Sequence, residues 1–571
     1  MIRRSTALLA LFAAAVAVLA LSGGTALADP GKAKSDEQKL SKIDHIVVVY
    51  EENHSFDNLY GGWEGVNGRA DAPASKITQV SQAGVPFTCL LQNDVNLTSP
   101  PQPADCVDAA NGVTSHFPNA LFSIENYIPK TARTCPPPGV FAPNGIKDPA
   151  GDPGGCTKDI VHRFYQEQYQ LNDGRQNRYT TGSDAVGLTQ GYYDTTQLPI
   201  YQYLHSKGHP DYAIADNFFQ SAFGGSFLNH QWLIAAATPP WAGMQAAQHA
   251  VVDSNGMPNG NPPSSGYGLY HPTGPVSDPA GTRVCPVGVD PNPGLACGDY
   301  AVNTIQPPYQ PTSSNPLKLS PQLGPTIGDR LSGAGVSWAW YSGGWSNADG
   351  DFTKPGYTNG VGACSDPNSF PNPSWPYCPN KVFQFHHQPL NYYASFAPGT
   401  AGRDNLKDEV EFQQLVAASD KKCQLNSVSF IKPIGLENEH PGYTNVDRGS
   451  SHLVKLIKSI EASSCEKNTM IIVTYDEFGG QWDHVSPPGQ GGAPGVHDIW
   501  GPGTRIPALV LAKDLKGKFV VDSTQYDTTS ILATIEHRYG LAALSPRDAT
   551  VHDLSNVFDA KKAKRDKTRR G

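Results

Sequence analysis

The stretch Ile43-Asp44-His45-Ile46-Val47-Val48-Val49-Tyr50 decides the fold class, because its second half is an almost unbroken β-branched run. Strands that are buried on both faces have this composition, and they occur in parallel sheets that helices cover on both sides. Met470–Tyr475 (MIIVTY) repeats the pattern, and Val428–Lys432 and Ile506–Leu511 are further strand candidates. The chain therefore contains several strands that require burial on both faces.

Helical signals alternate with these strands. Residues Ser450–Ser463 place four apolar side chains on one helical face, namely Leu453, Leu456, Ile457 and Ile460. Asp527 is positioned to cap a second helix that ends at Tyr539, before Gly540. Alternating strands and helices predict an α/β fold, a three-layer α/β/α sandwich with a mostly parallel central sheet. In such sheets ligands bind beyond the carboxyl ends of the strands.

Composition excludes two classes of protein. Only 17% of the 571 residues are charged and the net charge is −9, which argues against a nucleic-acid binder with a basic face. The 21 Phe, 24 Tyr and 9 Trp residues require burial, which excludes disorder along the whole chain. The 57 Gly and 49 Pro residues indicate long loops, and residues 253–326 are so rich in Pro, Gly, Asn and Ser that we expect a loop insertion there.

The first 28 residues are typical of a secretory signal peptide. Arg3 and Arg4 precede an apolar run over Ala7–Leu21, and the small residues that follow end at Ala28, the expected cleavage site. The apolar run is shorter than the roughly 20 residues that a membrane span needs, although an uncleaved anchor is the alternative. No later segment is apolar enough to cross a membrane, so we expect a secreted, extracellular protein.

The remaining boundaries follow from composition. Residues 29–42 are polar and are expected to be flexible, residues 43–555 form one large domain, and residues 556–571 form a basic tail. Such a tail is usually solvated, and attachment to a polyanion is the alternative. The ten cysteines favour disulfides in an exported chain. Pairing neighbours in sequence predicts Cys89–Cys106, Cys135–Cys156, Cys285–Cys297, Cys364–Cys378 and Cys423–Cys465, bridges that would staple the loop insertions.

Acidic groups follow two of the predicted strands. Glu51-Glu52-Asn53 comes directly after the first strand, and Asp476-Glu477 follows Met470–Tyr475, with Asp483 and His484 a few residues further on. If the two strands are neighbours, these oxygen ligands converge, and a divalent cation would relieve their repulsion. The alternative is a set of helix caps and turn residues, which are common roles for Asp and Asn.

A second feature is the segment Gly224-Gly225-Ser226, followed by a helix that we expect to begin at Phe227. A helix N-terminus suits an anion such as phosphate. An ordinary turn with Ser226 as the N-cap is the alternative. If Ser226 faces the acidic groups, a metal can lower the pKa of its hydroxyl and make it a nucleophile.

Histidines supply a third feature. His162, the pair His386-His387 and His440 lie in polar loops between predicted elements. Each alone would suit a hydrogen-bonded structural role. Together near one site, they could bind phosphate oxygens or protonate a leaving alkoxide.

These segments, taken in order, resemble a known family. HIVVVYEENHSFDNLYG, GGSFLNHQWL, QFHHQP and IIVTYDEFGGQWDHVSPP are similar to the bacterial phosphoesterase family of secreted acid phosphatases and phosphocholine-type phospholipases C. The likeness runs from about Asp44 to Asp548. It implies an alkaline-phosphatase-like fold, related to those of alkaline phosphatases and sulfatases, for the domain at 43–555.

The resemblance also implies roles for individual residues. It implies one divalent metal ion of open identity, held by Glu52, Asn53, Ser226, Asp476 and Glu477. Ser226 would be the nucleophile that forms a phosphoseryl intermediate. Of the other positions, the resemblance assigns His162, His387 and His440 to the catalytic set and Asn229, His386 and His484 to substrate binding. His386 and His387 match the family position to within one residue.

The nucleophile segment favours one branch of that family. The phospholipase C branch carries Thr in a Gly-Pro-Thr-x-Pro-Asn-Arg-like segment, whereas this chain has Gly-Gly-Ser-Phe-Leu-Asn-His. We therefore expect a phosphomonoesterase acting on a small phosphate ester. A phospholipase C acting on phospholipid head groups is the alternative, and a non-catalytic surface binding protein is a second one. Trp338, Trp340, Tyr341 and Trp345 would form either a cage for a quaternary ammonium or, as we expect, part of the core.

Overall fold

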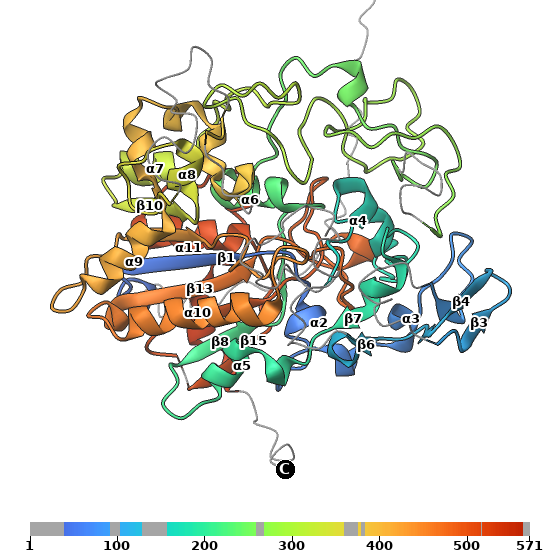
Figure 1. Cartoon of the computed structure of the whole chain (residues 1–571), viewed down its shortest axis with the longest axis horizontal. Helices are drawn as coiled ribbons and strands as arrows, with labels where there is room; N and C mark the ends of the chain where they lie inside the picture. The colour runs from blue at the N-terminus through green and yellow to red at the C-terminus, as the bar shows by residue number, and fades with distance from the viewer. Residues whose placement is uncertain are drawn as a thin grey trace, which may run out of the picture.

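A computed structural model describes residues 39–91, 103–127, 157–258, 268–358, 375–377, 383–515 and 517–562. Within that part of the chain the largest element is a nine-stranded sheet (Figure 1). Its strands are, in spatial order, β11 (Leu406–Asp408), β10 (Trp338–Ser342), β12 (Val428–Lys432), β1 (His45–Glu51), β13 (Thr469–Tyr475), β14 (Ala508–Leu511), β8 (Tyr212–Ala215), β15 (Phe519–Asp522) and β17 (Lys561–Lys562).

The sheet is mostly parallel. Strand β1 lies between β12 and β13 and is parallel to both, so the two acidic segments follow neighbouring strands as expected. Strands β14 and β17 pair antiparallel to their neighbours. Every residue of β13, and all of β1 after His45, is buried, which is the burial that their composition predicts.

Two helical layers cover the sheet. One contains α5 (Pro199–Leu204), α9 (Glu409–Ala417) and α10 (Val446–Glu461), and Figure 1 shows α9 and α10 crossing in front of the strands. The other contains α6 (Ser226–Ala235), α7 (Ile327–Gly333) and α11 (Thr529–Tyr539), with α6 in contact with both of the others. The predicted three-layer α/β/α sandwich is confirmed.

Helix α10 shows how local sequence sets an element. Its buried face includes Leu453, Leu456, Ile457 and Ile460, as the 3.6-residue period predicts. The helix begins at Val446 rather than at Ser450, because the Asn445 side chain caps it by accepting a hydrogen bond from the backbone N–H of Arg448.

Other boundaries also differ from prediction. Strand β14 begins at Ala508, two residues after Ile506, and it is antiparallel to β13. Helix α6 includes Ser226 as its first residue instead of beginning at Phe227. The N-cap of α11 is Thr528 rather than Asp527, although the Asp527 carboxylate accepts a hydrogen bond from the N–H of Thr529 at 2.7 Å.

Smaller elements surround the sheet. They are α2 (Phe56–Leu59), α3 (Ala74–Ile77), α4 (Phe164–Leu171), α8 (Trp345–Asp349) and the pairs β2 (Cys89–Leu90) with β5 (Phe117–Pro118), β3 (Cys106–Asp108) with β4 (Val113–Ser115), β6 (Phe122–Ser123) with β7 (Gly191–Tyr192), and β9 (Phe218–Phe219) with β16 (Tyr526–Asp527).

The insertion at 253–326 forms no helix or multi-residue strand over its described parts, 253–258 and 268–326. Cys285 and Cys297 are disulfide-bonded within it. The predicted bridges Cys89–Cys106 and Cys423–Cys465 are also confirmed. The predicted pairs Cys135–Cys156 and Cys364–Cys378 lie outside the described residues.

The predicted signal peptide at 1–28 lies outside the described residues. At the other end, the turn Leu554–Phe558 is largely buried and Lys561–Lys562 pair with β15, so regular structure continues beyond residue 556, where the basic tail was expected to begin. Among the described residues, no helix combines the length and the apolar character that a membrane span requires.

The aromatic residues in and after β10 belong to the core, as expected. Trp338, Trp340, Tyr341 and Trp345 are each at most 4% exposed. The Trp340 ring stacks on Phe430 with the centroids 5.2 Å apart, and Trp338 meets Phe396 edge to face. These contacts support packing rather than an open cage for a cationic ligand.

Candidate active site

The register of two strands brings the acidic segments together. In the parallel ladder Glu51 pairs with Tyr475, so Glu52 and Asp476 leave the sheet at the same level. The Asp476 N–H donates to the Glu51 carbonyl at 3.1 Å, and the Asn53 N–H donates to Asp476 Oδ1 at 3.1 Å. Residues more than 400 positions apart in the chain thus share one edge of the sheet.

Close backbone approach holds the two segments together. A Cβ added at Gly479 would lie 2.2 Å from the Asn53 carbonyl oxygen, and Gly479 has a φ of +62°. Asn53 itself adopts a φ of +63°, a conformation that asparagine tolerates better than most residues. Strained backbone of this kind is often found at functional sites.

The nucleophile segment approaches the same edge from α6. Gly224 has a φ of +90°, and a Cβ there would lie 2.6 Å from the backbone nitrogen of Phe164. The turn places Ser226 at the start of the buried helix α6, whose N-terminus favours negative charge. The Ser226 hydroxyl lies 3.3 Å from Asn53 Oδ1 and 3.2 Å from Glu477 Oε1. Ser226, Asn53 and Glu477 therefore meet, although they come from three distant segments.

The first acidic pair completes this cluster. Glu52 and Asp476 present carboxylate oxygens that lie within 4.8 Å of each other and of a His230 nitrogen. The structure thus brings together all five residues that are expected to hold a metal: Glu52, Asn53, Ser226, Asp476 and Glu477.

Asn229 occupies a different place from that expected. Its Nδ2 group donates to the carbonyls of Ala222, Gly224 and Gly225, and its Oδ1 accepts a hydrogen bond from the N–H of Ala222. Both ends of the buried amide therefore bind the backbone of the turn that carries Ser226. In this structure Asn229 holds that turn in place.

His162 and His440 orient Asn53. In each ring Nδ1 lies at hydrogen-bond distance from a carbonyl, that of Ile160 for His162 and that of Pro441 for His440. Each Nε2 then accepts from Asn53 Nδ2, at 3.4 Å and 3.0 Å respectively. Since two rings hold the amide nitrogen, the amide oxygen turns towards Ser226.

His386 and His387 both approach Glu52. His387 Nε2 lies 2.6 Å from Glu52 Oε1, and His386 Nε2 lies 3.7 Å from the same oxygen. Both rings are buried, and the carbonyl of His387 accepts a hydrogen bond from Trp340 Nε1. The sequence left open which of His386 and His387 matches the family position. In the structure both rings lie beside the Glu52 carboxylate.

Sequence reasoning missed two residues of the site. Lys432, the last residue of β12, is fully buried with its Nζ 2.8 Å from Glu52 Oε1. His230 lies one turn after Ser226 on α6, with Nδ1 2.8 Å from the Ser226 carbonyl and 3.7 Å from Asp476 Oδ2. Two signals could have identified them: a charged residue ending a buried strand, and the i, i+4 spacing on a helix.

The electrostatics of the carboxylates differ. Burial would raise the pKa of Glu52, but the ammonium of Lys432 and the His387 ring outweigh it and hold that pKa well below the usual range. Burial raises the pKa of Asp476 to about 7, and burial together with the Asp476 charge raises the pKa of Glu477 well above its ordinary value. Lys432 and His387 thus compensate the negative charge of Glu52, whereas the charges of Asp476 and Glu477 lack comparable compensation.

Four of the buried histidines at the site are held neutral. Burial lowers the pKa of His386 to about 3, and burial also lowers the pKa values of His162, His387 and His230. A neutral imidazole offers a ring nitrogen that can coordinate a metal, and its N–H can donate to a phosphate oxygen.

The polar atoms at the site fit a divalent cation. Asp476 Oδ2 and His230 Nε2 are buried and make no hydrogen bond within the described part of the chain. The Glu52 oxygens likewise make none beyond their contacts with Lys432 and the histidines. Buried polar groups are rarely left without partners, so this cluster has the property of a ligand site. Its mixed oxygen and nitrogen donors suit several divalent metals.

His484 belongs to a separate cluster. Its Nδ1 lies 2.5 Å from Asp57 Oδ2 and its Nε2 lies 2.9 Å from Asn67 Oδ1. The buried guanidinium of Arg505 contacts the carboxylates of both Asp57 and Asp483 at 3.2 Å. This ion-pair network ties the loop after β1 to the loop after β13. The structure therefore gives His484 partners in this network rather than at Ser226.

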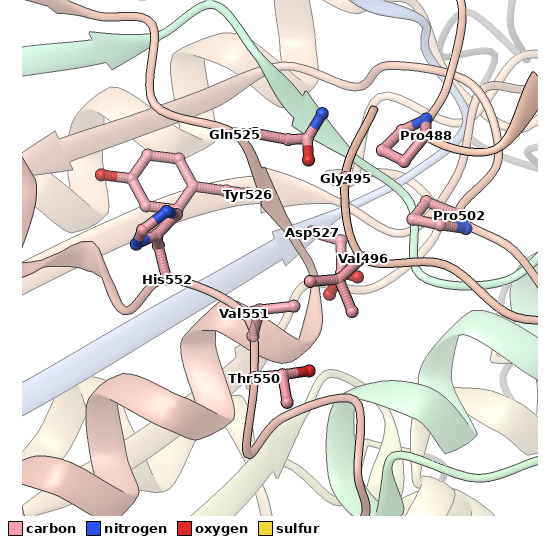
Figure 2. A pocket seen from close by; sticks show the side chains of 10 residues that line it. All are labelled: Pro488, Gly495, Val496, Pro502, Gln525, Tyr526, Asp527, Thr550, Val551 and His552. Atoms are coloured by element: carbon pink, nitrogen blue, oxygen red, sulfur yellow. The ribbon is translucent and has the colours of Figure 1, made fainter. Parts of the chain in front are cut away.

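A small pocket lies apart from the cluster at Ser226. Figure 2 shows Asp527 and Val496 beside it, and its volume is about 160 Å³. The Asp527 carboxylate is already bonded to Ser221, Thr529 and Arg547. None of the candidate site residues lines this pocket, so it is distinct from the acidic site.

Comparisons with known proteins identify the family of the chain. Residues 43–542 match the phosphoesterase family, and the chain belongs to that family. The protein is therefore a hydrolase that acts on phosphoric ester bonds.

Particular relatives include two mycobacterial proteins. Phospholipase C B of Mycobacterium tuberculosis is 24% identical over 553 residues, which cover 91% of this chain and 78% of that protein. Phospholipase C A of the same organism is 23% identical over 552 residues, with the same coverage. A solved structure from Vibrio parahaemolyticus, described as a protein in the alkaline phosphatase superfamily, covers 42% of this chain and 55% of its own, with 17% identity and a TM-score of 0.23.

Proposed function

We propose that the protein is an exported phosphomonoesterase in which Ser226 attacks the phosphorus atom of a small phosphate ester, with one divalent metal ion at the site. The observation that carries the proposal is the position of Ser226 Oγ, within hydrogen-bond distance of Asn53 Oδ1 and Glu477 Oε1 at the N-terminus of α6. Its disulfides and its sequence support export.

The residues that would hold the metal are Glu52, Asn53, Ser226, Asp476 and Glu477. When bound, it supplies charge neutralisation for the phosphate oxygens and lowers the pKa of the Ser226 hydroxyl. His230, His386 and His387 lie beside the carboxylates of Glu52 and Asp476 and keep their orientation.

The reaction then has two displacements. Ser226 loses its proton along the hydrogen bond to Glu477, its Oγ forms a bond to phosphorus, and the bond from phosphorus to the ester oxygen breaks. The leaving alkoxide takes one proton from water. Water then cleaves the phosphoserine, which releases inorganic phosphate and restores Ser226.

A second candidate is a phospholipase C. The observation that favours it is the similarity to mycobacterial phospholipases C along 91% of the chain. The choice of a monoester over a phosphodiester rests on the segment Gly224-Gly225-Ser226. The phospholipase C branch of the family carries Thr in the corresponding segment.

The test is a direct comparison of two chromogenic substrates, a phosphate monoester and a phosphorylcholine ester, with the purified protein supplied with Mn²⁺. Faster turnover of the monoester is expected, together with a phosphorylated Ser226 peptide after acid quenching, detected by mass spectrometry. Preferential hydrolysis of the phosphorylcholine ester would establish the second candidate. Turnover without any phosphoserine would exclude the covalent route.

A further inference from the structure

The loop of residues 284–297, here called the valine loop, exposes apolar side chains. Val284 is 63% exposed, Val287 is 103% exposed and Val289 is 96% exposed. Single exposed apolar residues are normal on protein surfaces. Here three valines lie within six residues, and two of them have essentially their whole surface in water, so burial against an apolar phase would stabilise them.

The valine loop is held in a fixed shape. Cys285 and Cys297 close it as a disulfide. The guanidinium of Arg283, which precedes the ring, donates two hydrogen bonds to Asp290 and also donates to the carbonyls of Asn292 and Leu295, three residues within the ring. Since these contacts already order the loop, its docking on a partner would lose little conformational entropy.

The base of the loop is tied to a helix beside the active site. The Tyr165 hydroxyl accepts a hydrogen bond from the Arg283 N–H at 2.8 Å and donates to the Ala296 carbonyl at 2.7 Å, so it bridges both ends of the loop. Tyr165 lies in α4, which begins two residues after His162. In Figure 1 the light-green insertion lies above α4, at the end of the sheet where β1 points.

Charge narrows the choice of partner. Residues 284–297 contain no Lys or Arg, and their one acidic residue, Asp290, is neutralised by Arg283. An anionic membrane attracts basic segments, which this loop lacks. A neutral, apolar loop instead suits the interface of a zwitterionic lipid layer, into which small apolar side chains can insert.

We propose that the valine loop docks the protein on zwitterionic lipid surfaces and so holds the Ser226 site close to phosphomonoesters at such a surface. This inference rests on the proposed function for the chemistry, whereas the docking itself requires no turnover. Insertion of Val287 and Val289 carries the affinity, and the disulfide and Tyr165 keep the loop in position relative to the site.

Sedimentation with sucrose-loaded phosphatidylcholine vesicles tests the proposal, with EDTA present so that binding is measured without hydrolysis. The wild-type protein is expected to sediment with the vesicles. The V287D/V289D double variant is expected to bind at least about tenfold more weakly, because each exposed valine that enters an apolar phase contributes roughly that factor.

A matched control is V107D. Val107 is 61% exposed and follows Cys106 of the Cys89–Cys106 disulfide, but it lies on β3, outside the insertion. This variant should bind vesicles like the wild type. All three proteins should keep the same melting temperature and the same turnover of a soluble chromogenic monoester, which shows that the double variant is folded.

Three outcomes would overturn the proposal: no sedimentation of the wild type, equal sedimentation of the double variant, or binding that requires added phosphatidylserine. A concentration-dependent dimer that the double variant abolishes would assign the valine loop to self-association instead. A protein that binds vesicles but hydrolyses no phosphoester would leave the docking intact and remove the proposed function, so the two failures are distinguishable.

Discussion

The Ser226 hydroxyl lies 3.2 Å from Glu477 Oε1, and 251 residues separate the two in the chain. A serine without an activating partner is a weak nucleophile. Placed beside the carboxylates that follow β1 and β13, it gains both an acceptor for its proton and a position for metal-assisted attack.

Replacement of Ser226 by Ala should lower kcat by about three orders of magnitude or more, which corresponds to about 4 kcal/mol of activation free energy. The cause is loss of the attacking oxygen, with the carboxylates left in place. Steady-state assays with the chromogenic monoester measure the effect. Ser221→Ala is the matched control, since Ser221 is also buried in this turn but hydrogen-bonds Asp527. Near-normal kcat in S226A would rule Ser226 out as the nucleophile.

Lys432 should be essential for stability when no metal is bound. Its Nζ compensates the buried Glu52 carboxylate at 2.8 Å, so Lys432→Met is expected to cost about 3–5 kcal/mol of unfolding free energy in EDTA. Mn²⁺ should raise Tm more in K432M than in the wild type, because the cation replaces the missing positive charge. Thermal melts with and without metal measure both effects.

Lys458→Met is the control for that experiment. Lys458 is exposed on α10, with its Nζ 4.7 Å from the Tyr203 ring centroid. Its loss should change stability by less than about 1 kcal/mol, with no dependence on metal. An equal Tm for K432M and the wild type in EDTA would show that Glu52 does not need Lys432.

Glu167 should support the turn that carries Ser226. It accepts hydrogen bonds from the N–H groups of Gly224 and Thr504, the Thr504 hydroxyl and Gln220 Nε2. In Glu167→Gln, an NH₂ group replaces one of the oxygens that accept these hydrogen bonds and faces the same donors. We expect a loss of about 2 kcal/mol in the free energy of unfolding and a lower kcat. Denaturant unfolding and steady-state kinetics on the same samples measure the two effects.

Glu536→Gln is the matched control for this prediction. Burial and the nearby Asp548 raise the pKa of Glu536 to about 8, so the residue is protonated at neutral pH and glutamine resembles it closely. The change should stay within about 0.5 kcal/mol. Equal effects of E167Q and E536Q would mean that burial alone, and not the four donors, determines the cost.

His452 should make stability depend on pH. Burial lowers its pKa, but the hydrogen bond and charge of Glu409, 2.6 Å away, and the charge of Glu437 outweigh burial and Lys455, so the pKa is raised. The native state then holds the proton more tightly than the unfolded state does. The stabilisation is complete below the unfolded pKa of about 6.5 and is lost as pH rises through the higher folded pKa.

The Tm of the wild type should therefore fall relative to that of His452→Gln as pH rises above about 6.5. Calorimetric melts of both proteins on either side of this pH measure the difference. A constant difference in Tm would show that His452 does not titrate in the folding reaction.

Much of the fold could be predicted from strands with unambiguous composition. Val428–Lys432 has the predicted bounds. Strand β13 extends the prediction by one residue, because its run of β-branched residues has few alternatives. The antiparallel direction of β14 could not be predicted, since a buried strand has the same composition in either direction. The start of α10 depended on a cap by Asn445, which precedes the point where the apolar period becomes clear.

The site was predicted as a set of residues but not as a network. Acidic residues after two strands, and a serine after paired glycines, were visible in the sequence. Lys432 and His230 were missed because their two signals, a charged residue at the end of a buried strand and an i, i+4 spacing on a helix, do not by themselves show which groups lie nearby in space. The roles proposed for Asn229 and His484 came from family likeness, whereas their contacts here are with the backbone of one turn and with Asp57.

The reversed direction of β14 has a consequence for the evolution of substrate choice. Because β13 runs towards the catalytic edge and β14 runs back from it, the intervening segment 476–507 starts and finishes on the catalytic side without crossing a helical layer. Insertions or exchanges within it can remodel the surroundings of the site while the sheet register stays the same. Residues 485–503 of that segment, which include none of the expected metal ligands, are where we would graft sequence from a relative to change what the enzyme accepts.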